Sequence, residues 1–120
     1  AAELADGWYP LGSNPTFPMG TPDQLKAGLD RLAQYAERFG RDPSAIDTIY
    51  RTHQAELNKE SGGKDRMLFV GNGEEIVEDV QKYQDIGVTS MIWDFLRRTD
   101  DFDSVLEQME DFANQVMTNI

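Results

Sequence analysis

The sequence predicts an α/β fold in which a small parallel sheet is built from three consecutive strand–helix units. Short runs rich in β-branched and aromatic residues alternate with longer segments whose apolar residues recur at three- and four-residue steps. Each unit spans roughly 35 to 45 residues, enough for the crossover that joins two parallel strands. With 120 residues, of which 39% are hydrophobic, the chain is expected to form a single domain, residues 1–120.

The first unit is expected to comprise a strand at residues 5–9 and a helix at residues 21–39. Residues 1–5, which precede the strand, resemble the last turn of a helix. Thr21 is a suitable N-cap, and Pro22 is favoured in the first helical turn. Gly40 suits the left-handed position that follows a helix. The expected apolar stripe of this helix consists of Leu25, Leu29, Leu32, Ala36 and Phe39.

The second unit is expected to comprise a strand at residues 46–55 and a helix at residues 73–85. Asn72 is a plausible cap for this helix, and Gly87 would terminate it. The apolar stripe consists of Ile76, Val80 and Tyr83. Residues 58–65 are polar and contain glycine, which predicts a loop, and residues 67–70 could add a short extended piece.

The third unit is expected to comprise a strand at residues 88–95 and the most strongly periodic helix of the chain. The strand is a compact apolar run, typical of a buried strand in a parallel sheet. The helix should begin near Asp101 or Asp103 and continue almost to Ile120. Its apolar stripe consists of Phe102, Val105, Leu106, Met109, Phe112, Ala113 and Val116.

The composition excludes several classes of function. The chain has 22 acidic and 11 basic residues and a net charge of −11, which repels phosphate backbones and anionic lipids. We therefore expect no nucleic-acid partner and no membrane partner. The absence of cysteine excludes disulfides and thiolate chemistry. No apolar run approaches the ~20 residues of a membrane span, so we expect a soluble, cytoplasmic protein.

Four short motifs occur in an order and spacing that is more specific than any one of them. They are Ala5-Asp6-Gly7-Trp8, Gly40-Arg41-Asp42-Pro43, Gly71 with Glu74-Glu75-Ile76, and Tyr83 with Gly87-Val88. In this arrangement the chain resembles the C-terminal part of the luciferase-like monooxygenases, and especially their flavin-dependent or coenzyme F-420-dependent oxidoreductases. The resemblance covers nearly the whole chain but only the last third of the family's pattern.

The resemblance implies a partial (β/α)8 TIM barrel, in which the three units would be the sixth, seventh and eighth. It implies a parent oxidoreductase that uses FMN or coenzyme F-420, while the cofactor performs the redox chemistry. The family's contacts with the cofactor draw heavily on earlier strands. We therefore expect this chain to be a C-terminal fragment that is inactive and binds no cofactor alone, and no catalytic residue is assigned.

The resemblance also indicates where pocket residues would lie, because the working residues of such barrels follow the C-terminal ends of the strands. The candidates are Trp8, Tyr9, His53, Asp94, Arg97 and Arg98.

Several of these candidates, and Trp93 with them, have a plainer interpretation. His53 could act as a base or bind a flavin-like ring, or it could be an exposed side chain at a strand end. Asp94 could contact substrate or cofactor, or pair with Arg97 or Arg98. Trp8 and Trp93 could stack on a planar ring, although aromatic residues in strands more often belong to the core.

Other polar clusters have structural explanations. Glu74-Glu75 and Asp100-Asp101 lie at expected helix starts, where carboxylates complement the helix dipole, so no metal site is expected. Gly62-Gly63 and the stretch 71–73 lack the phosphate-loop pattern.

A sheet covered by helices on one side would leave its other face bare. Candidates for that face are Tyr50 and Thr52, with one parity of Met91, Ile92, Trp93 and Phe95. Such a face favours self-association, so a homo-oligomer is expected. The alternative function is a non-catalytic, self-associating α/β binding or assembly module. A weaker alternative is an anion-binding protein that uses Arg97, Arg98 and Asp94.

Overall fold

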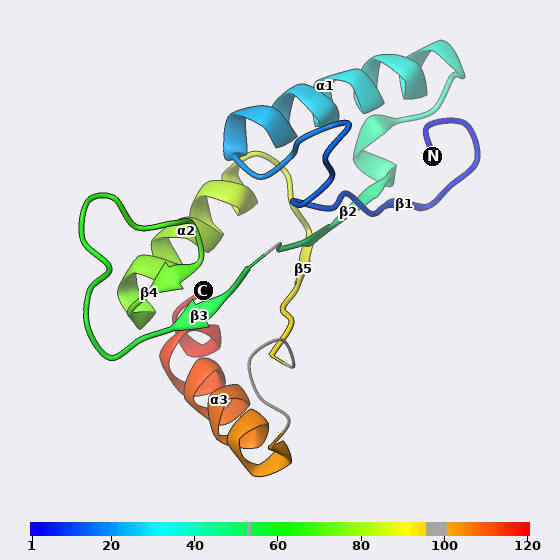
Figure 1. Ribbon diagram of the computed structural model, residues 1–120. Coiled ribbons are helices and arrows are strands. Elements are labelled where there is room, and N and C mark those ends of the chain that lie inside the picture. The colour runs from blue at the N-terminus through cyan, green and yellow to red at the C-terminus, as the bar shows by residue number, and fades with distance from the viewer. Residues whose placement is uncertain (53, 96–100) are drawn as a thin grey trace. The chain divides into compact units, whose positions relative to one another are not determined.

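A computed structural model describes residues 1–52, 54–95 and 101–120 and confirms a mixed α/β chain (Figure 1). Its helices are α1 (Pro22–Arg38), α2 (Gly73–Asp85) and α3 (Phe102–Gln115), with short 3-10 turns at Pro43–Ala45 and Met117–Asn119. The described residues form two compact units. The first unit contains residues 1–52 and 83–92, and the second unit contains residues 54–82, 93–95 and 101–120. Below, the terms first unit and second unit denote these two compact parts and not the strand–helix units expected from the sequence.

The first unit contains a three-stranded parallel sheet, as the sequence predicts. Its strands are β1 (Gly7–Trp8), β2 (Asp47–Arg51) and β5 (Ser90–Ile92), in the order β1-β2-β5. In the register of the sheet Trp8 lies beside Thr48, and Tyr50 lies beside Met91. The Thr89 hydroxyl and N–H both donate to the Thr48 carbonyl, which fixes β5 against β2. The strands are shorter than the expected ranges.

Helix α1 has almost the bounds that the sequence predicts, because both of its ends are specified locally. The Thr21 hydroxyl accepts a hydrogen bond from the Gln24 N–H, and the Gln24 side chain accepts one from the Thr21 N–H, which forms a capping box. Gly40 follows the helix with φ +70°, the left-handed conformation that glycine adopts readily. Leu25 and Ala36 are fully buried.

One face of the sheet is covered within the first unit. The Tyr50 ring lies 4.7 Å from the Tyr83 ring, and the Tyr50 hydroxyl donates to the Met19 carbonyl. Tyr50 and Thr52 are buried, with exposed fractions of 0% and 4%. The expectation that these two side chains belong to a bare face is therefore wrong. Strand alternation alone does not say which parity faces the helices, and here the even-numbered residues of β2 do.

The opposite face of the sheet is more exposed. Leu11 lies beside Arg51, and Arg51 lies beside Ile92, so these three residues form a row across the sheet. Leu11 and Ile92 are 39% and 41% exposed, and Tyr9 is 47% exposed. Strand β5 was expected to be buried, but its Ser90 and Ile92 are exposed. The reason is that β5 is an edge strand, and these two residues have the parity that faces away from Tyr83.

The second unit contains most of α2, and the bounds of this helix agree with the prediction. The Asn72 side chain accepts from the Glu75 N–H, and the Glu75 carboxylate accepts from the Asn72 N–H, each at 3.0 Å. This reciprocal cap explains why the helix begins at Gly73. Ile76, within the first turns of α2, is fully buried.

A two-stranded parallel sheet, β3 (Glu56–Leu57) and β4 (Val70–Gly71), also lies in the second unit. Strand β4 overlaps the short extended piece expected at residues 67–70, whereas β3 was not expected. The β3 N–H of Glu56 donates to the Phe69 carbonyl. Phe69 has φ +63°, a left-handed conformation that is unusual for an aromatic residue.

Helix α3 begins where the sequence predicts and ends earlier. The Asp101 carboxylate accepts from the Ser104 N–H at 3.2 Å, which makes Asp101 the N-cap. Val105, Phe112 and Val116 are buried on one side of the helix. The chain then continues as the 3-10 turn Met117–Asn119 and not as the expected α-helix.

Residues 1–5 form a turn with helical hydrogen bonding, in agreement with the sequence. The Ala5 N–H donates to the Ala1 carbonyl at 2.9 Å. One guanidinium nitrogen of Arg41 lies within hydrogen-bonding distance of the carbonyls of Ala1, Ala2 and Ala5. Arg41 therefore satisfies carbonyl groups as a basic side chain does at a helix C-terminus.

Candidate functional site

A concave site in the second unit has a volume of about 260 Å³. It is built from β3, from the segment that follows β5, and from α3. Its described lining residues are Ala55, Glu56, Leu57, Trp93, Phe95, Gln108 and Phe112. We call this site the aromatic pocket.

Three packed rings form the wall of the aromatic pocket. The Trp93 and Phe112 ring centroids lie 4.4 Å apart, and Phe95 meets Phe112 edge to face at 5.5 Å. Phe69 supports Trp93 from another direction, edge to face at 5.3 Å. Because Phe112 belongs to the buried side of α3, the wall is fixed by the core of the unit. Such a wall suits a flat, apolar ring.

Two polar side chains accompany the rings. Glu56 and Gln108 lie in the described lining beside Trp93, whose indole N–H can also donate a hydrogen bond. A carboxylate accepts and an amide both donates and accepts, so the two groups could orient a ring that carries N–H or C=O groups. The described lining contains no lysine, arginine or histidine that could neutralise a phosphate.

The residues predicted from the sequence are distributed differently. Trp8 and Tyr9 lie in the first unit, and their alternating directions place Trp8 towards α1 and Tyr9 on the exposed face. Asp94 lies in the second unit between Trp93 and Phe95, is partly buried, and does not line the aromatic pocket. The structure does not bring Trp8 and Tyr9 together in one site.

Three of the predicted site residues cannot be placed. His53, Arg97 and Arg98 lie outside the described residues. The ion pair suggested for Asp94 with either arginine therefore stays a prediction.

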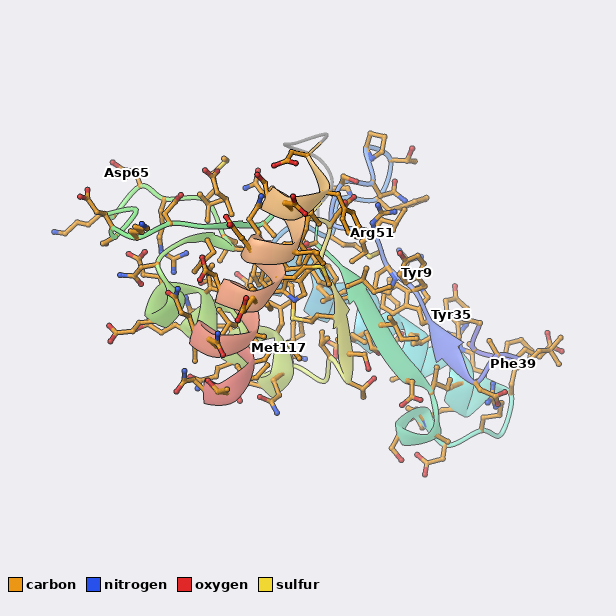
Figure 2. All side chains as sticks on the ribbon, turned by 90° about the horizontal axis from the view of Figure 1, so that it is seen from below. Tyr9, Tyr35, Phe39, Arg51, Asp65 and Met117 are labelled. Atoms are coloured by element: carbon orange, nitrogen blue, oxygen red, sulfur yellow. The ribbon has the colours of Figure 1, made fainter. Side chains whose placement is uncertain are left out.

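Trp8 lines a second hollow, a groove of about 500 Å³ along α1 in the first unit. The Trp8 ring approaches α1 at Gly28, where a side chain would leave no room for it. Tyr35 and Phe39, near the C-terminal end of α1, line the groove while 45% and 51% exposed (Figure 2). Arg31 and Glu3 place one positive and one negative side chain in this otherwise largely apolar groove.

A polar network that sequence reasoning missed surrounds α2 in the second unit. Asp79 is fully buried, and its carboxylate accepts from two guanidinium nitrogens of Arg66 at 2.5 and 3.0 Å. It also accepts from Lys82 at 3.0 Å and from the Phe69 N–H at 2.9 Å. Burial by itself would raise the pKa of Asp79, but these hydrogen bonds outweigh it and hold that pKa below its ordinary value.

Glu75 forms the second part of the network. Its carboxylate accepts from the Ser61 hydroxyl at 2.5 Å and from the Gly62 and Asn72 N–H groups at 3.0 Å each. These bonds, led by that from Ser61, lower the pKa of Glu75 to about 2. The backbone groups of Gly62 and Asn72 that could have bound a phosphate therefore hold a carboxylate of the same chain. The rejection of a phosphate loop is thus supported by the hydrogen bonds.

The network had one signal in the sequence. Asp79 lies three residues after Ile76 and four before Tyr83, on the apolar side of α2, where a carboxylate requires partners. Nothing local identifies Arg66 as that partner, since it is supplied by the preceding loop. Within the described ranges, no group of three or more His, Cys, Asp or Glu side chains is arranged to hold a metal ion.

Comparisons with known proteins provide no further identification. No protein-family model matches the chain, and no curated protein matches it. In the part of the chain that the structure describes, every helix is too short or too polar to cross a bilayer.

The lowered pKa of Glu75 predicts a dependence of stability on pH. Since the pKa is about 2 in the folded chain and ordinarily 4.5, the contribution of Glu75 is complete above pH 4.5 and is lost as the pH falls towards 2. We expect the stability of Glu75→Gln to fall less than that of wild type as the pH is lowered, with stability measured as the urea midpoint at several pH values. The exposed neighbour offers a control for the loss of one negative charge, Glu74→Gln, measured in the same way. Equal slopes for wild type and Glu75→Gln would contradict the assignment.

The burial of Asp79 predicts a large effect of its removal. Asp79→Ala leaves the guanidinium of Arg66, only 13% exposed, without its main partner and should cost about 3 to 5 kcal/mol of unfolding free energy. The matched control is Asp30→Ala, which breaks the exposed Lys26–Asp30 pair and should cost less than about 1 kcal/mol. Denaturant unfolding measures both. Similar losses in the two variants would show that Asp79 carries no special role.

Proposed function

We propose that this chain forms the last three strand–helix units of a luciferase-like TIM barrel, an oxidoreductase or monooxygenase dependent on FMN or coenzyme F-420. The observation that supports this proposal is the all-parallel sheet β1-β2-β5, whose strands follow one another in chain order with a helix in each connection. This is the repeating topology of a (β/α)8 barrel. Many families share this topology, and the four motifs are the reason for proposing the luciferase-like family among them.

The exposed sheet face is consistent with the same proposal. In a closed barrel this face would be packed by layers of side chains from neighbouring strands. In the first unit it carries Leu11 and Ile92, both more than one-third exposed, together with Tyr9. Missing neighbours in the barrel would explain why apolar side chains remain at this surface.

The described residues fit only part of such a cofactor. The rings of Trp93 and Phe95 offer a wall for a planar ring system, and Glu56 or Gln108 could bind its polar edge. A volume of about 260 Å³ lies below the ~300–1,000 Å³ of typical ligand sites, and the described lining offers no cation for a phosphate. We therefore assign no catalytic step to these residues. The chain alone is expected to bind neither cofactor and to be inactive.

The exposed sheet face also favours a second candidate, a non-catalytic module that associates with itself. A second copy could cover Leu11, Tyr9 and Ile92 and remove apolar surface from water. The net charge of −11 opposes such association, so salt should strengthen it.

The coding sequence before Ala1 tests the first candidate. We expect further strand–helix units there, including a strand followed by paired glycines, and we expect the extended chain to bind FMN or coenzyme F-420. In the extended chain, Trp93→Ala should weaken binding about tenfold or more, because it removes part of the ring wall. The exposed Met67→Ser serves as a control and should bind like wild type. Fluorescence titration measures both.

Two results would contradict this proposal. One is a start codon directly before Ala1, and the other is an extended chain that binds neither cofactor. Tight cofactor binding by the present chain alone would contradict its expected lack of a complete site.

Light scattering tests the second candidate. A self-associating module should form an oligomer at micromolar concentration, and Ile92→Lys should dissociate it by placing a charge on the exposed face. Phe17→Lys, at another exposed apolar position, should leave the oligomer intact. A wild-type chain that remains monomeric with and without added salt would exclude self-association.

A further inference from the structure

Helix α3 in the second unit has apolar residues on two adjacent sides, and only one side is buried. Val105 and Phe112 are each 5% exposed and face the core of the unit. Phe102, Leu106 and Met109 are 69%, 47% and 48% exposed. Steps of four and three residues place these last three side chains in one row along the helix. We call this row the α3 stripe.

Each residue of the α3 stripe is followed directly by an acidic residue. These residues, Asp103, Glu107 and Glu110, repeat the same steps of four and three and form a second row beside the stripe. We call them the acidic rim. All three side chains are exposed, and none forms an ion pair within the residues that the structure describes.

The charge of the rim restricts what could cover the stripe. Helix α3 contains no lysine or arginine, and the whole chain carries a net charge of −11. A second copy packed antiparallel would place one acidic rim beside the other, and a parallel copy would provide no positive charge for either rim. Anionic lipid is repelled in the same way. A basic partner both covers the stripe and neutralises the rim.

We propose that α3 binds a basic amphipathic helix of a partner protein through the α3 stripe and the acidic rim. The partner helix carries apolar residues at three- and four-residue steps, with lysine or arginine beside them. Apolar contact supplies the affinity, and the rim sets the choice of a positively charged partner. Met109 is unbranched and can adapt its shape to the partner. This inference uses no cofactor.

The experiment uses two amphipathic peptides of about 20 residues, longer than the about 12 to 15 residues below which an isolated helix is marginal. Both carry leucine at three- and four-residue steps, and the remaining positions are lysine in one peptide and glutamate in the other. Calorimetric titration of the full chain measures both affinities, and NMR shift changes locate the site. We expect the lysine peptide to bind at least about tenfold more tightly than the glutamate peptide. The shift changes should centre on α3.

Two pairs of variants separate specific docking from general attraction to an acidic protein. The double variant Leu106→Ser with Met109→Ser keeps the net charge and should weaken binding of the lysine peptide about tenfold. The control Met67→Ser changes another exposed methionine and should leave this binding unchanged. Circular dichroism verifies that the variants remain folded.

The second pair reverses charge. Glu107→Lys with Glu110→Lys should make the glutamate peptide the preferred ligand, whereas Glu3→Lys with Glu37→Lys gives the same net charge and should keep the preference of wild type. Binding that responds to net charge alone, or shift changes outside α3, would overturn the proposal. So would a chain that dimerises through α3, or one that binds neither peptide.

Discussion

The second unit depends on the buried carboxylate of Asp79. Its bonds to Arg66 and Lys82 neutralise a charge that could not remain unpaired in the interior. Its bond to the Phe69 N–H holds a residue whose left-handed backbone costs about 1 to 2 kcal/mol in isolation. With Phe69 in place, its carbonyl accepts from Glu56 and its ring supports Trp93. The pairing of β3 with β4 and the wall of the aromatic pocket thus both depend on the interactions of the Asp79 carboxylate.

The two candidate functions arise from the same property of the first unit, a parallel sheet with helical cover on one face. A barrel and an oligomer are two ways to bury the other face, and the exposed side chains of Tyr9 and Ile92 are compatible with both. The arguments that separate them lie elsewhere. The proposed resemblance of four short motifs to the luciferase-like family favours the barrel, and the net charge of −11 opposes association between identical copies.

The helices could be predicted from the sequence because their ends are encoded locally. Thr21, Asn72 and Asp101 each cap the helix that directly follows them, and the structure places all three helix starts within a residue or two of expectation. The covered face of β2 could not be predicted, since alternation gives two sets of residues but not the set that meets Tyr83. The two-residue strand β3 carries no periodic signal at all.

The candidate site was harder to predict than the fold. Trp93 was considered as a ring-stacking residue, but its partners Glu56, Gln108 and Phe112 come from segments far apart in the sequence. Their convergence depends on tertiary packing, which no local pattern encodes. Asp79 shows what the pattern does offer, because a carboxylate on the apolar side of a helix indicates a buried partner without identifying it.

The left-handed backbone of Phe69 has a consequence for how the second unit opens. An isolated loop would rarely adopt that conformation, so β4 keeps its position only while the first turns of α2 present Asp79. Fraying of those turns would release the strand pair and one support of Trp93 together. Amide protons of Glu56, Asn58 and Phe69, all donors in this arrangement, should then exchange with solvent at a common rate, as members of one cooperative block.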